Sequence, residues 1–475
     1  MNMTFHSKLP VAIIGAGPIG LAAAAHLVER GLPFVVLEAG QGPAAAVSQW
    51  GHVTFFSPWR FNVDSAAERL LRQTGWVMPD PERDPTGQEL IDDYLAPLAG
   101  LPAIASNIRY SAEVTAVTRQ GMDRVPSNGR EQRPFEISAS GADGRTERIL
   151  ASAVIDASGT WTAPNPAGAN GIPALGEKES VARIAKGIPD VFGADRKRYG
   201  GKRVVVIGSG HSAMDSILNL TRLKHEVPTT EIIWAMRSRP SDKTFGGGAD
   251  DQLANRGALG KRAKTAIASG NVLVEAPFRT YSFALAKNAI EIMDETGKKI
   301  IADEVIVATG FRPDFSMLSE IRLDLHPWLE SARELGPLID PNEHSCGDVP
   351  PHGVRELTQP ENNFFIAGMK SYGRAPTFLM ATGYEQVRSI VAALAGDMEA
   401  ALDTKLVLPQ TGVCEGIGHG EEGSCCGGPS LTRADAFALS MQSKRTLASR
   451  AVAVLPARFP LGWNHPSEKK SRQTN

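Results

Sequence analysis

A glycine motif near the N-terminus constrains the fold more than any other feature of the sequence. Gly15, Gly17 and Gly20 follow the apolar run Val11–Ile14 and precede an alanine-rich segment of helical character. In such a motif the first glycine permits a tight turn, the second lets backbone amides approach a diphosphate, and the third lets helix and strand pack closely. A second apolar run ends in Glu38, whose carboxylate can accept hydrogen bonds from ribose hydroxyls. These features predict a dinucleotide-binding strand–turn–helix–strand unit.

The same order of elements returns about two hundred residues later. Gly208 and Gly210 repeat the first two glycines, alanine takes the third position, and Ser212 opens the predicted helix. The second strand of this unit runs into Arg237 and Arg239, where the first unit has an acid. Guanidinium groups at that place suit the 2′-phosphate of NADPH, whereas the alternative is a pair of solvated charges.

Two further strand-like runs end alike, in Ala157-Ser158-Gly159 and in Ala308-Thr309-Gly310, and proline follows each of them closely. We interpret them as paired crossovers between two domains. The sequence therefore predicts an α/β fold of two Rossmann-like, three-layer dinucleotide-binding domains, with the second inserted in the first and a cysteine-containing C-terminal extension. The predicted boundaries are 1–165 with 320–400 for the first domain, 166–319 for the second, and 401–475 for the extension.

Composition excludes several classes of function. The formal net charge of −2 and the lack of a basic stripe interleaved with aromatics argue against nucleic acid as a partner. The apolar N-terminal run carries the fixed glycines, so we expect neither a signal peptide nor a membrane span. Four cysteines, three of them clustered, do not form a secreted disulfide framework, and we expect a reducing cytoplasm. The sequence does not indicate an oligomeric state.

The two glycine motifs, the two strand ends and the run FFIAGMKSYG at 364–373 together resemble the flavin-containing monooxygenases, a branch of the two-dinucleotide-binding flavoproteins. The resemblance implies that the first motif binds FAD and the second NADPH. It also implies that the chain after residue 368 passes the pyrimidine edge of the flavin and begins a helix there, whose N-terminus stabilises negative charge. The cofactor-binding residues implied in this way are Thr309, Gly310, Gly368, Thr382 and Gln386.

The aromatic segment from Trp50 to Arg60 falls where related proteins place residues over the flavin ring. We expect Trp50 to contact the cofactor, and Arg60 or Asn62 to be catalytic by orienting NADPH or a flavin oxygen adduct. The same aromatics are equally typical of a buried loop.

Two departures from the family pattern matter. The monooxygenase signature histidine is missing from the linker Val191–Tyr199, which weakens an assignment to amine oxygenation or Baeyer–Villiger chemistry. No Cys-x-x-Cys pair lies near either cofactor motif, so a disulfide-reductase mechanism lacks its redox disulfide. Electrons from NADPH must then leave the flavin for another acceptor, and dioxygen is the natural candidate.

Cys414, Cys425 and Cys426 lie in a glycine-rich stretch with His419. Three thiols that a loop can gather favour a soft centre such as trivalent arsenic. The pattern is similar to flavin monooxygenases associated with arsenic resistance. Zinc bound by the cysteines and His419, or an incidental cluster without function, are the alternatives.

Together these features predict an FAD-dependent, NADPH-consuming monooxygenase that oxidises a small soft-heteroatom substrate, a trivalent organoarsenical or a thiol, with dioxygen. Two alternatives stay open at this point. One is an NADPH oxidase or flavin reductase that passes electrons to oxygen or to a partner. The other is a non-catalytic redox or soft-metal sensor.

Overall fold

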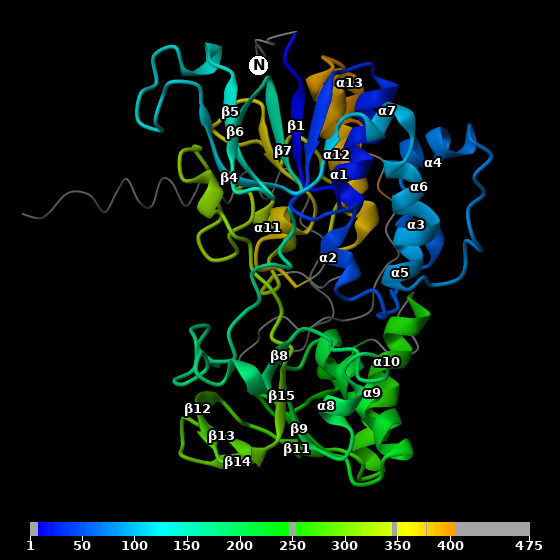
Figure 1. The fold of residues 1–475 in the computed structure, drawn as a ribbon, viewed down its shortest axis with the longest axis vertical. Helices are drawn as coiled ribbons and strands as arrows, with labels where there is room; N and C mark the ends of the chain where they lie inside the picture. The colour runs from blue at the N-terminus through cyan, green and yellow to red at the C-terminus, as the bar shows by residue number, and fades with distance from the viewer. Residues whose placement is uncertain (1–7, 247–252, 344–348, 377, 405, 407–475) are drawn as a thin grey trace, which may run out of the picture. The chain divides into compact units, whose positions relative to one another are not determined.

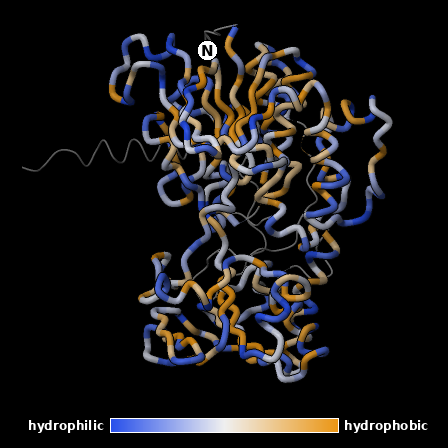
Figure 2. Tube along the Cα trace, in the orientation of Figure 1, coloured by the Kyte–Doolittle hydropathy of each residue, from blue (hydrophilic) through white to orange (hydrophobic). Residues whose placement is uncertain are grey.

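The computed structural model describes residues 8–246, 253–343, 349–376, 378–404 and 406. Its first sheet has five parallel strands in the order β16-β7-β1-β2-β3. Parallel strands covered on both faces read as continuous apolar runs, and the strands β1, β2, β7 and β16 are buried throughout. Figure 2 shows hydrophobic residues concentrated along these strands. The strands are β1 (Val11–Ile14), β2 (Phe34–Leu37), β3 (Ile108–Arg109), β7 (Ala153–Asp156) and β16 (Phe364–Ile366).

Helices α1 (Pro18–Glu29) and α12 (Met380–Leu394) pack on one face of this sheet and against each other (Figure 1). The helix α1 begins after Gly17 with Pro18 in its first turn, a position where the missing proline N–H costs nothing. The alanines at 22–25 are fully buried, so the two helices can approach closely.

An antiparallel three-stranded sheet covers the other face of the first sheet, and Phe135 meets Phe364 across this layer with ring centroids 6.3 Å apart. The segment between β2 and β3 forms short helices. Asp64 caps one of them through Ala66 N and Ala67 N, and Thr86 forms a capping box with Glu89 in another. These elements are β4 (Ala112–Arg119), β5 (Phe135–Gly141), β6 (Thr146–Ala151), α2 (Ala45–Ser48), α3 (Trp59–Asn62), α4 (Ser65–Arg72), α5 (Gly87–Leu90), α6 (Ala96–Ala99) and α7 (Pro102–Ala105).

The second sheet repeats the plan, with parallel strands in the order β11-β10-β9-β15-β8 and a second antiparallel sheet, β12-β13-β14. The helix α9 follows β9 directly and packs with α10. The predicted α/β fold with two dinucleotide-binding units is thereby confirmed. The elements are β8 (Ile184–Lys186), α8 (Arg196–Tyr199), β9 (Arg203–Ile207), α9 (His211–Glu226), β10 (Glu231–Ala235), α10 (Ala254–Ala268), β11 (Leu273–Glu275), β12 (Thr280–Ala286), β13 (Ala289–Asp294), β14 (Lys299–Ala302) and β15 (Glu304–Val307).

The chain leaves the first sheet after β7 and returns to it at β16, with strands β8 to β15 in between. The outgoing and returning segments lie side by side, because Pro164 and Phe311 form an antiparallel bridge and Asn165 N donates to Gly310 O at 2.9 Å. This is the arrangement expected for paired crossovers. The domain boundaries at 165/166, 319/320 and 400/401 stay predictions. Two short helices, α11 (Gly336–Ile339) and α13 (Met398–Leu402), complete the described part of the chain, in which no helix is long and apolar enough to cross a membrane.

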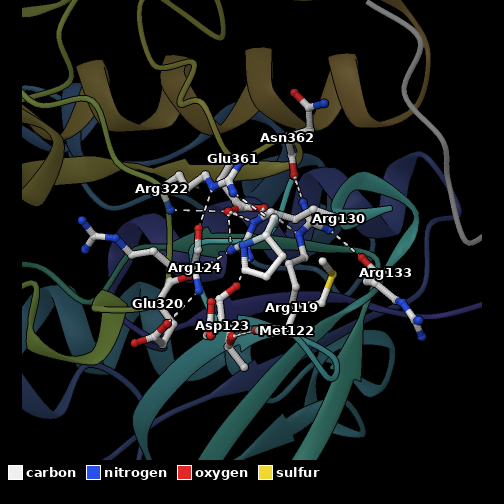
Figure 3. Close-up of polar contacts among 12 residues, drawn as sticks. Arg119, Met122, Asp123, Arg124, Arg130, Arg133, Glu320, Arg322, Glu361 and Asn362 are labelled. Carbon is white, nitrogen blue, oxygen red and sulfur yellow. Dashed lines mark hydrogen bonds and ion pairs between the residues drawn. The ribbon is translucent and has the colours of Figure 1, made fainter. Parts of the chain in front are cut away.

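A buried charge cluster ties the antiparallel sheet to the segment before β16 (Figure 3). Glu361 accepts from Arg119 Nε at 2.7 Å and from Arg130 Nη2 at 2.8 Å, and all three side chains are at most 3% exposed. The remaining guanidinium N–H groups donate to backbone carbonyls, among them those of Asn362 and Asp123. Burial alone raises the pKa of the Glu361 carboxyl, but the hydrogen bonds from the two arginines bring it below its ordinary value.

We predict that Glu361→Gln lowers the free energy of unfolding by about 3 kcal/mol, because two arginines then remain buried with too little negative charge. Urea denaturation measures the change. The lowered pKa means that the stabilisation exists above the ordinary glutamate pKa of about 4.3 and is lost as the pH falls through the folded value, so the difference from wild type shrinks in acid. The control is Glu231→Gln in the exposed pair with Arg203, which should change stability by less than about 1 kcal/mol. Equal losses in the two variants would contradict the assignment.

Candidate cofactor and substrate site

The first glycine turn has the geometry that a bound diphosphate requires. Gly15 has a φ of +98°, and a methyl group on Gly20 would lie 1.9 Å from the Gly15 carbonyl oxygen, so neither position tolerates a side chain. Gly17 precedes the first turn of α1, and the space beside its Cα is open. The free N–H groups of a helix N-terminus together with that open space suit a dinucleotide diphosphate.

Glu38 stands at the end of β2, beside this turn. Its Oε2 accepts from Ala16 N at 2.6 Å and its Oε1 accepts from Gly40 N at 2.8 Å. One oxygen is thus fixed by a backbone N–H group of the glycine turn, and the other by one from the segment after β2. A carboxylate held in this way keeps lone pairs for ribose hydroxyls, as its position in the motif predicts.

The second glycine turn repeats these features. Gly208 has a φ of +132°, and a methyl group there would lie 2.3 Å from Ala308 O. Gly210 precedes α9 and has open space beside it, and Ser212 lies half-buried in the first turn of that helix. Trp234 Nε1 donates to Gly208 O at 2.6 Å and so holds the turn on the sheet.

The two arginines predicted to recognise a 2′-phosphate follow β10. Arg237 and Arg239 are exposed, and neither has an ion-pair partner among the described residues. No carboxylate in the part of the chain that the structure describes therefore neutralises their guanidinium groups.

Thr309 and Gly310 lie where the two crossovers meet. Thr309 Oγ1 donates to Asn165 O at 3.1 Å, Asn165 Nδ2 donates to Thr309 O at 3.0 Å, and Gly310 has a φ of +83°. These bonds clamp the outgoing chain to the returning chain, a structural role that the sequence motif alone did not indicate. Their predicted cofactor contact stays a prediction.

The segment after β16 is held by a buried hydrogen-bond network. Gln386 Oε1 accepts from Gly368 N at 2.8 Å, and its Nε2 donates to Ser371 Oγ at 2.9 Å and to His352 Nε2 at 3.1 Å. Nδ1 of His352 lies 3.1 Å from Pro350 O and donates to it, which leaves Nε2 as the acceptor. Burial lowers the pKa of His352, so the ring is neutral at pH 7.

Gln386 and Thr382, two predicted cofactor residues, are thus fully buried in α12. Thr382 hydrogen-bonds with Tyr372, a residue of the same segment. Both side chains shape the segment that begins at Gly368. Whether they also contact a cofactor stays a prediction.

Sequence reasoning missed a buried lysine in this segment. Lys370 Nζ lies 2.7 Å from Asp156 Oδ2 and donates to Ser158 Oγ at 3.1 Å, and both charged side chains are at most 2% exposed. The pair joins the end of β7 to the turn after β16. The signal in the sequence is a lysine within a run of otherwise apolar or small residues. Such a lysine, once buried, needs a buried partner of opposite charge.

Trp50 belongs to an aromatic cluster at the crossovers. Trp161 stacks on Phe311 with ring centroids 4.8 Å apart, and Trp50 contacts both Trp161 at 6.2 Å and Phe55 at 5.4 Å. Trp161 Nε1 donates to Gln49 Oε1 at 2.8 Å. The sequence analysis overlooked Trp161, although it stands two residues after the Ala157-Ser158-Gly159 strand end.

The two candidate catalytic residues are placed differently. Arg60 is exposed, pairs with Glu82 and lies over the ring of Phe61. Asn62 is fully buried, with Oδ1 accepting from Ser57 Oγ at 2.8 Å and Nδ2 donating to Ser57 O at 2.5 Å. The structure does not bring the two side chains into one site, and their catalytic role stays a prediction.

Cys414, Cys425, Cys426 and His419 lie outside the described residues, as does the isolated Cys346. In the described part of the chain no three His, Cys, Asp or Glu side chains gather as a metal site would require.

A cleft of about 710 Å³ opens beside Trp161, within the size range of small-molecule sites. It is lined from four parts of the chain: the segment around α2, the start of α5, Trp161 itself, and the stretch from β8 into the linker that lacks the signature histidine. The lining residues are Ser48, Gln49, Gly51, His52, Thr86, Gln88, Trp161, Ala185, Lys186, Ile188, Pro189, Asp190, Ala194 and Asp195.

Residues 12–345 match the pyridine nucleotide-disulphide oxidoreductase family, which is more than half of the chain. The chain belongs to this family. It is a two-dinucleotide-binding flavoprotein and an oxidoreductase, and membership implies a flavin and a pyridine nucleotide as cofactors.

Curated relatives of this flavoprotein include flavin-containing monooxygenase FMO GS-OX-like 2 of Arabidopsis thaliana, 27% identical over 46% of this chain and 48% of that protein. Indole-3-pyruvate monooxygenase YUCCA1 of Oryza sativa subsp. japonica is 27% identical over 44% of each chain. The chain spans about half the length of the curated relatives it matches.

Two solved structures show the same fold. Bacillithiol disulfide reductase Bdr (YpdA) from Bacillus cereus gives a TM-score of 0.60 at 18% identity, covering 82% of this chain and 99% of that one. A mutant form of a flavin monooxygenase from Stenotrophomonas maltophilia gives a TM-score of 0.53 at 22% identity, covering 82% of this chain and 98% of that one. At these identities the likeness concerns the fold alone.

We predict opposite outcomes for alanine at the two open glycines. Gly17→Ala should fold but lose most of its bound flavin, because the methyl group fills the space for the first diphosphate. Gly210→Ala should keep its flavin and bind the pyridine nucleotide at least about 10-fold more weakly, since losing a charge-assisted hydrogen bond costs ~1.5–3 kcal/mol. Flavin absorbance and a nucleotide titration measure the two effects. Loss of both cofactors in either variant would contradict this separation of the sites.

Proposed function

We propose that this flavoprotein is an NADPH-consuming, FAD-dependent monooxygenase that oxidises a soft heteroatom of a small substrate. The observation that carries the proposal is the pair of glycine turns, each with open space beside a helix N-terminus, joined by clamped crossovers in one chain. The absence of a Cys-x-x-Cys pair near either turn argues against an internal disulfide as the electron acceptor. Bound FAD would supply the chemistry, by accepting hydride from the nicotinamide and making dioxygen reactive.

The overall reaction balances without a further reductant. NADPH provides two electrons, solvent provides a proton, one oxygen atom of dioxygen goes to a lone pair of the substrate, and the other leaves as water. The chain's own residues bind and orient the reactants. The turn before α1 and Glu38 would hold FAD, the turn before α9 would hold NADPH, and the cluster around Trp50 and Trp161 would exclude water.

Pyridine nucleotide choice rests on Arg237 and Arg239. Replacing both by alanine should raise KM for NADPH about 10-fold or more and leave KM for NADH nearly unchanged, because only NADPH carries the 2′-phosphate that these cations would bind. Steady-state kinetics with each nucleotide measures the effect. A parallel rise for NADPH and NADH would contradict 2′-phosphate recognition.

The assay that tests the function follows NADPH oxidation by the FAD-loaded protein with trivalent organoarsenicals, thiols, thioethers and amines, and quantifies product and peroxide. We expect product in equal amount to NADPH for soft-heteroatom substrates. Peroxide equal to NADPH with every compound would indicate an oxidase or reductase instead. No turnover with any acceptor would favour a sensor.

The role of the three clustered cysteines is tested separately. If Cys414, Cys425 and Cys426 gather a thiophilic substrate, Cys425→Ser with Cys426→Ser should lower organoarsenical turnover about 10-fold or more, because serine oxygen binds soft centres poorly. Thioether turnover should change little and serves as the control. Unchanged arsenical turnover would remove the argument for arsenic and leave organosulfur compounds as the substrate class.

A further inference from the structure

The cleft beside Trp161 carries an unbalanced negative charge. Asp190 and Asp195 line it; Asp195 stands in the linker that lacks the signature histidine, and Asp190 directly precedes that linker. Lys186 also lines it, but the ammonium group of that lysine pairs with Glu177. The lysine charge is therefore already matched by a carboxylate that does not line the cleft.

Two arginines of the same linker pair away from the cleft. Arg196 Nη2 lies 2.6 Å from Glu226 Oε2, and Arg198 Nε lies 2.7 Å from Glu304 Oε2. Neither arginine lines the cleft. No arginine lines the cleft beside the two aspartates, and the lysine that lines it already pairs with Glu177.

Hydrogen bonds from backbone N–H groups fix the orientation of both carboxylates and do not neutralise their charge. Asp190 Oδ1 accepts from Gly193 N at 2.8 Å, and Asp195 Oδ2 accepts from Asp190 N at 3.1 Å. Burial alone raises the pKa of the Asp190 carboxyl, but hydrogen bonds from Gly193 and Ala194 bring it below its ordinary value. Asp195 Oδ1 accepts no hydrogen bond from any described residue.

One aromatic side chain, that of Trp161, also lines the cleft. The ring of Trp161 is held by its stack on Phe311 and by the bond from its Nε1 to Gln49, so it is a rigid wall. Sulfur packs favourably against aromatic rings, whereas the phosphates of a dinucleotide would be repelled by the two carboxylates.

We propose that this cleft binds the substrate and selects a small organosulfur compound bearing a protonated amine, with the ammonium group held by Asp190 and Asp195 and the sulfur against Trp161. The assignment rests on the proposed oxygenation of soft heteroatoms and specifies its substrate class. An ammonium nitrogen held by carboxylates has no lone pair to oxidise, so oxygen goes to sulfur. The linker without its signature histidine thereby becomes the element that sets specificity.

The test compares 2-(methylthio)ethylamine with 2-(methylthio)ethanol, which share the sulfur and differ in charge. Assays at pH 8 keep the amine protonated. Wild type should show a kcat/KM at least about 10-fold higher for the amine, since a charge-assisted hydrogen bond contributes ~1.5–3 kcal/mol. Asp195→Asn should remove most of that preference by lowering kcat/KM for the amine far more than for the alcohol, and Asp195→Glu should restore part of it.

The matched control is Asp143→Asn, in an exposed turn paired with Arg145, which should change neither substrate. Flavin absorbance and the melting temperature verify that each variant is folded. Equal kcat/KM for amine and alcohol in wild type, or equal losses for both in Asp195→Asn, would overturn the proposal.

Calorimetric titration of the FAD-loaded protein with propylammonium, which has no sulfur, separates this proposal from the proposed function. Binding that Asp195→Asn weakens about 10-fold supports the cleft even if no thioether is oxidised. If thioethers are oxidised but propylammonium does not bind, the proposed monooxygenase function stands and the proposal that this cleft binds an ammonium group is rejected.

Discussion

Close backbone contact at two glycine turns is the constraint on which the rest of the structure depends. At Gly20 a methyl group would lie 1.9 Å from the Gly15 carbonyl oxygen, and at Gly208 it would lie 2.3 Å from Ala308 O. Helix, strand and neighbouring crossover can meet there only because no side chain intervenes. Gly17 and Gly210 also lack a side chain, which leaves open space beside each of them. The glycines of each turn therefore allow close packing of the core and leave room for the two cofactors.

The second constraint is that the outgoing and the returning crossover lie side by side at one junction. The bonds between Asn165 and Thr309 hold outgoing and returning chain together, and Trp161 stacks on Phe311 beside them. Rigid elements place functional groups more accurately than free loops do. The cleft wall, the aromatic cluster and the end of the second glycine unit are therefore all positioned by a few bonds at this junction.

Buried charges join segments that are far apart in sequence. Glu361 meets Arg119 and Arg130 in one cluster, and Lys370 meets Asp156 in another. Each charge costs desolvation energy that only a well-placed partner offsets. Such pairs cannot be read from the sequence, because the spacing between the partners follows no period and only the folded chain brings them together.

The sequence alone determined the two dinucleotide units, since their glycines, strands and helices are local and periodic. The observed α9 begins within one residue of Ser212, where the second motif predicts its helix to start. It also showed that no Cys-x-x-Cys pair stands near either motif. The tertiary structure alone decided that Gln386 and Thr382 are buried supports, that Arg60 and Asn62 lie in different environments, and that Asp190 and Asp195 face a cleft with Trp161. These outcomes depend on which distant segments meet and on which partner each polar group finds there, and no local pattern records either.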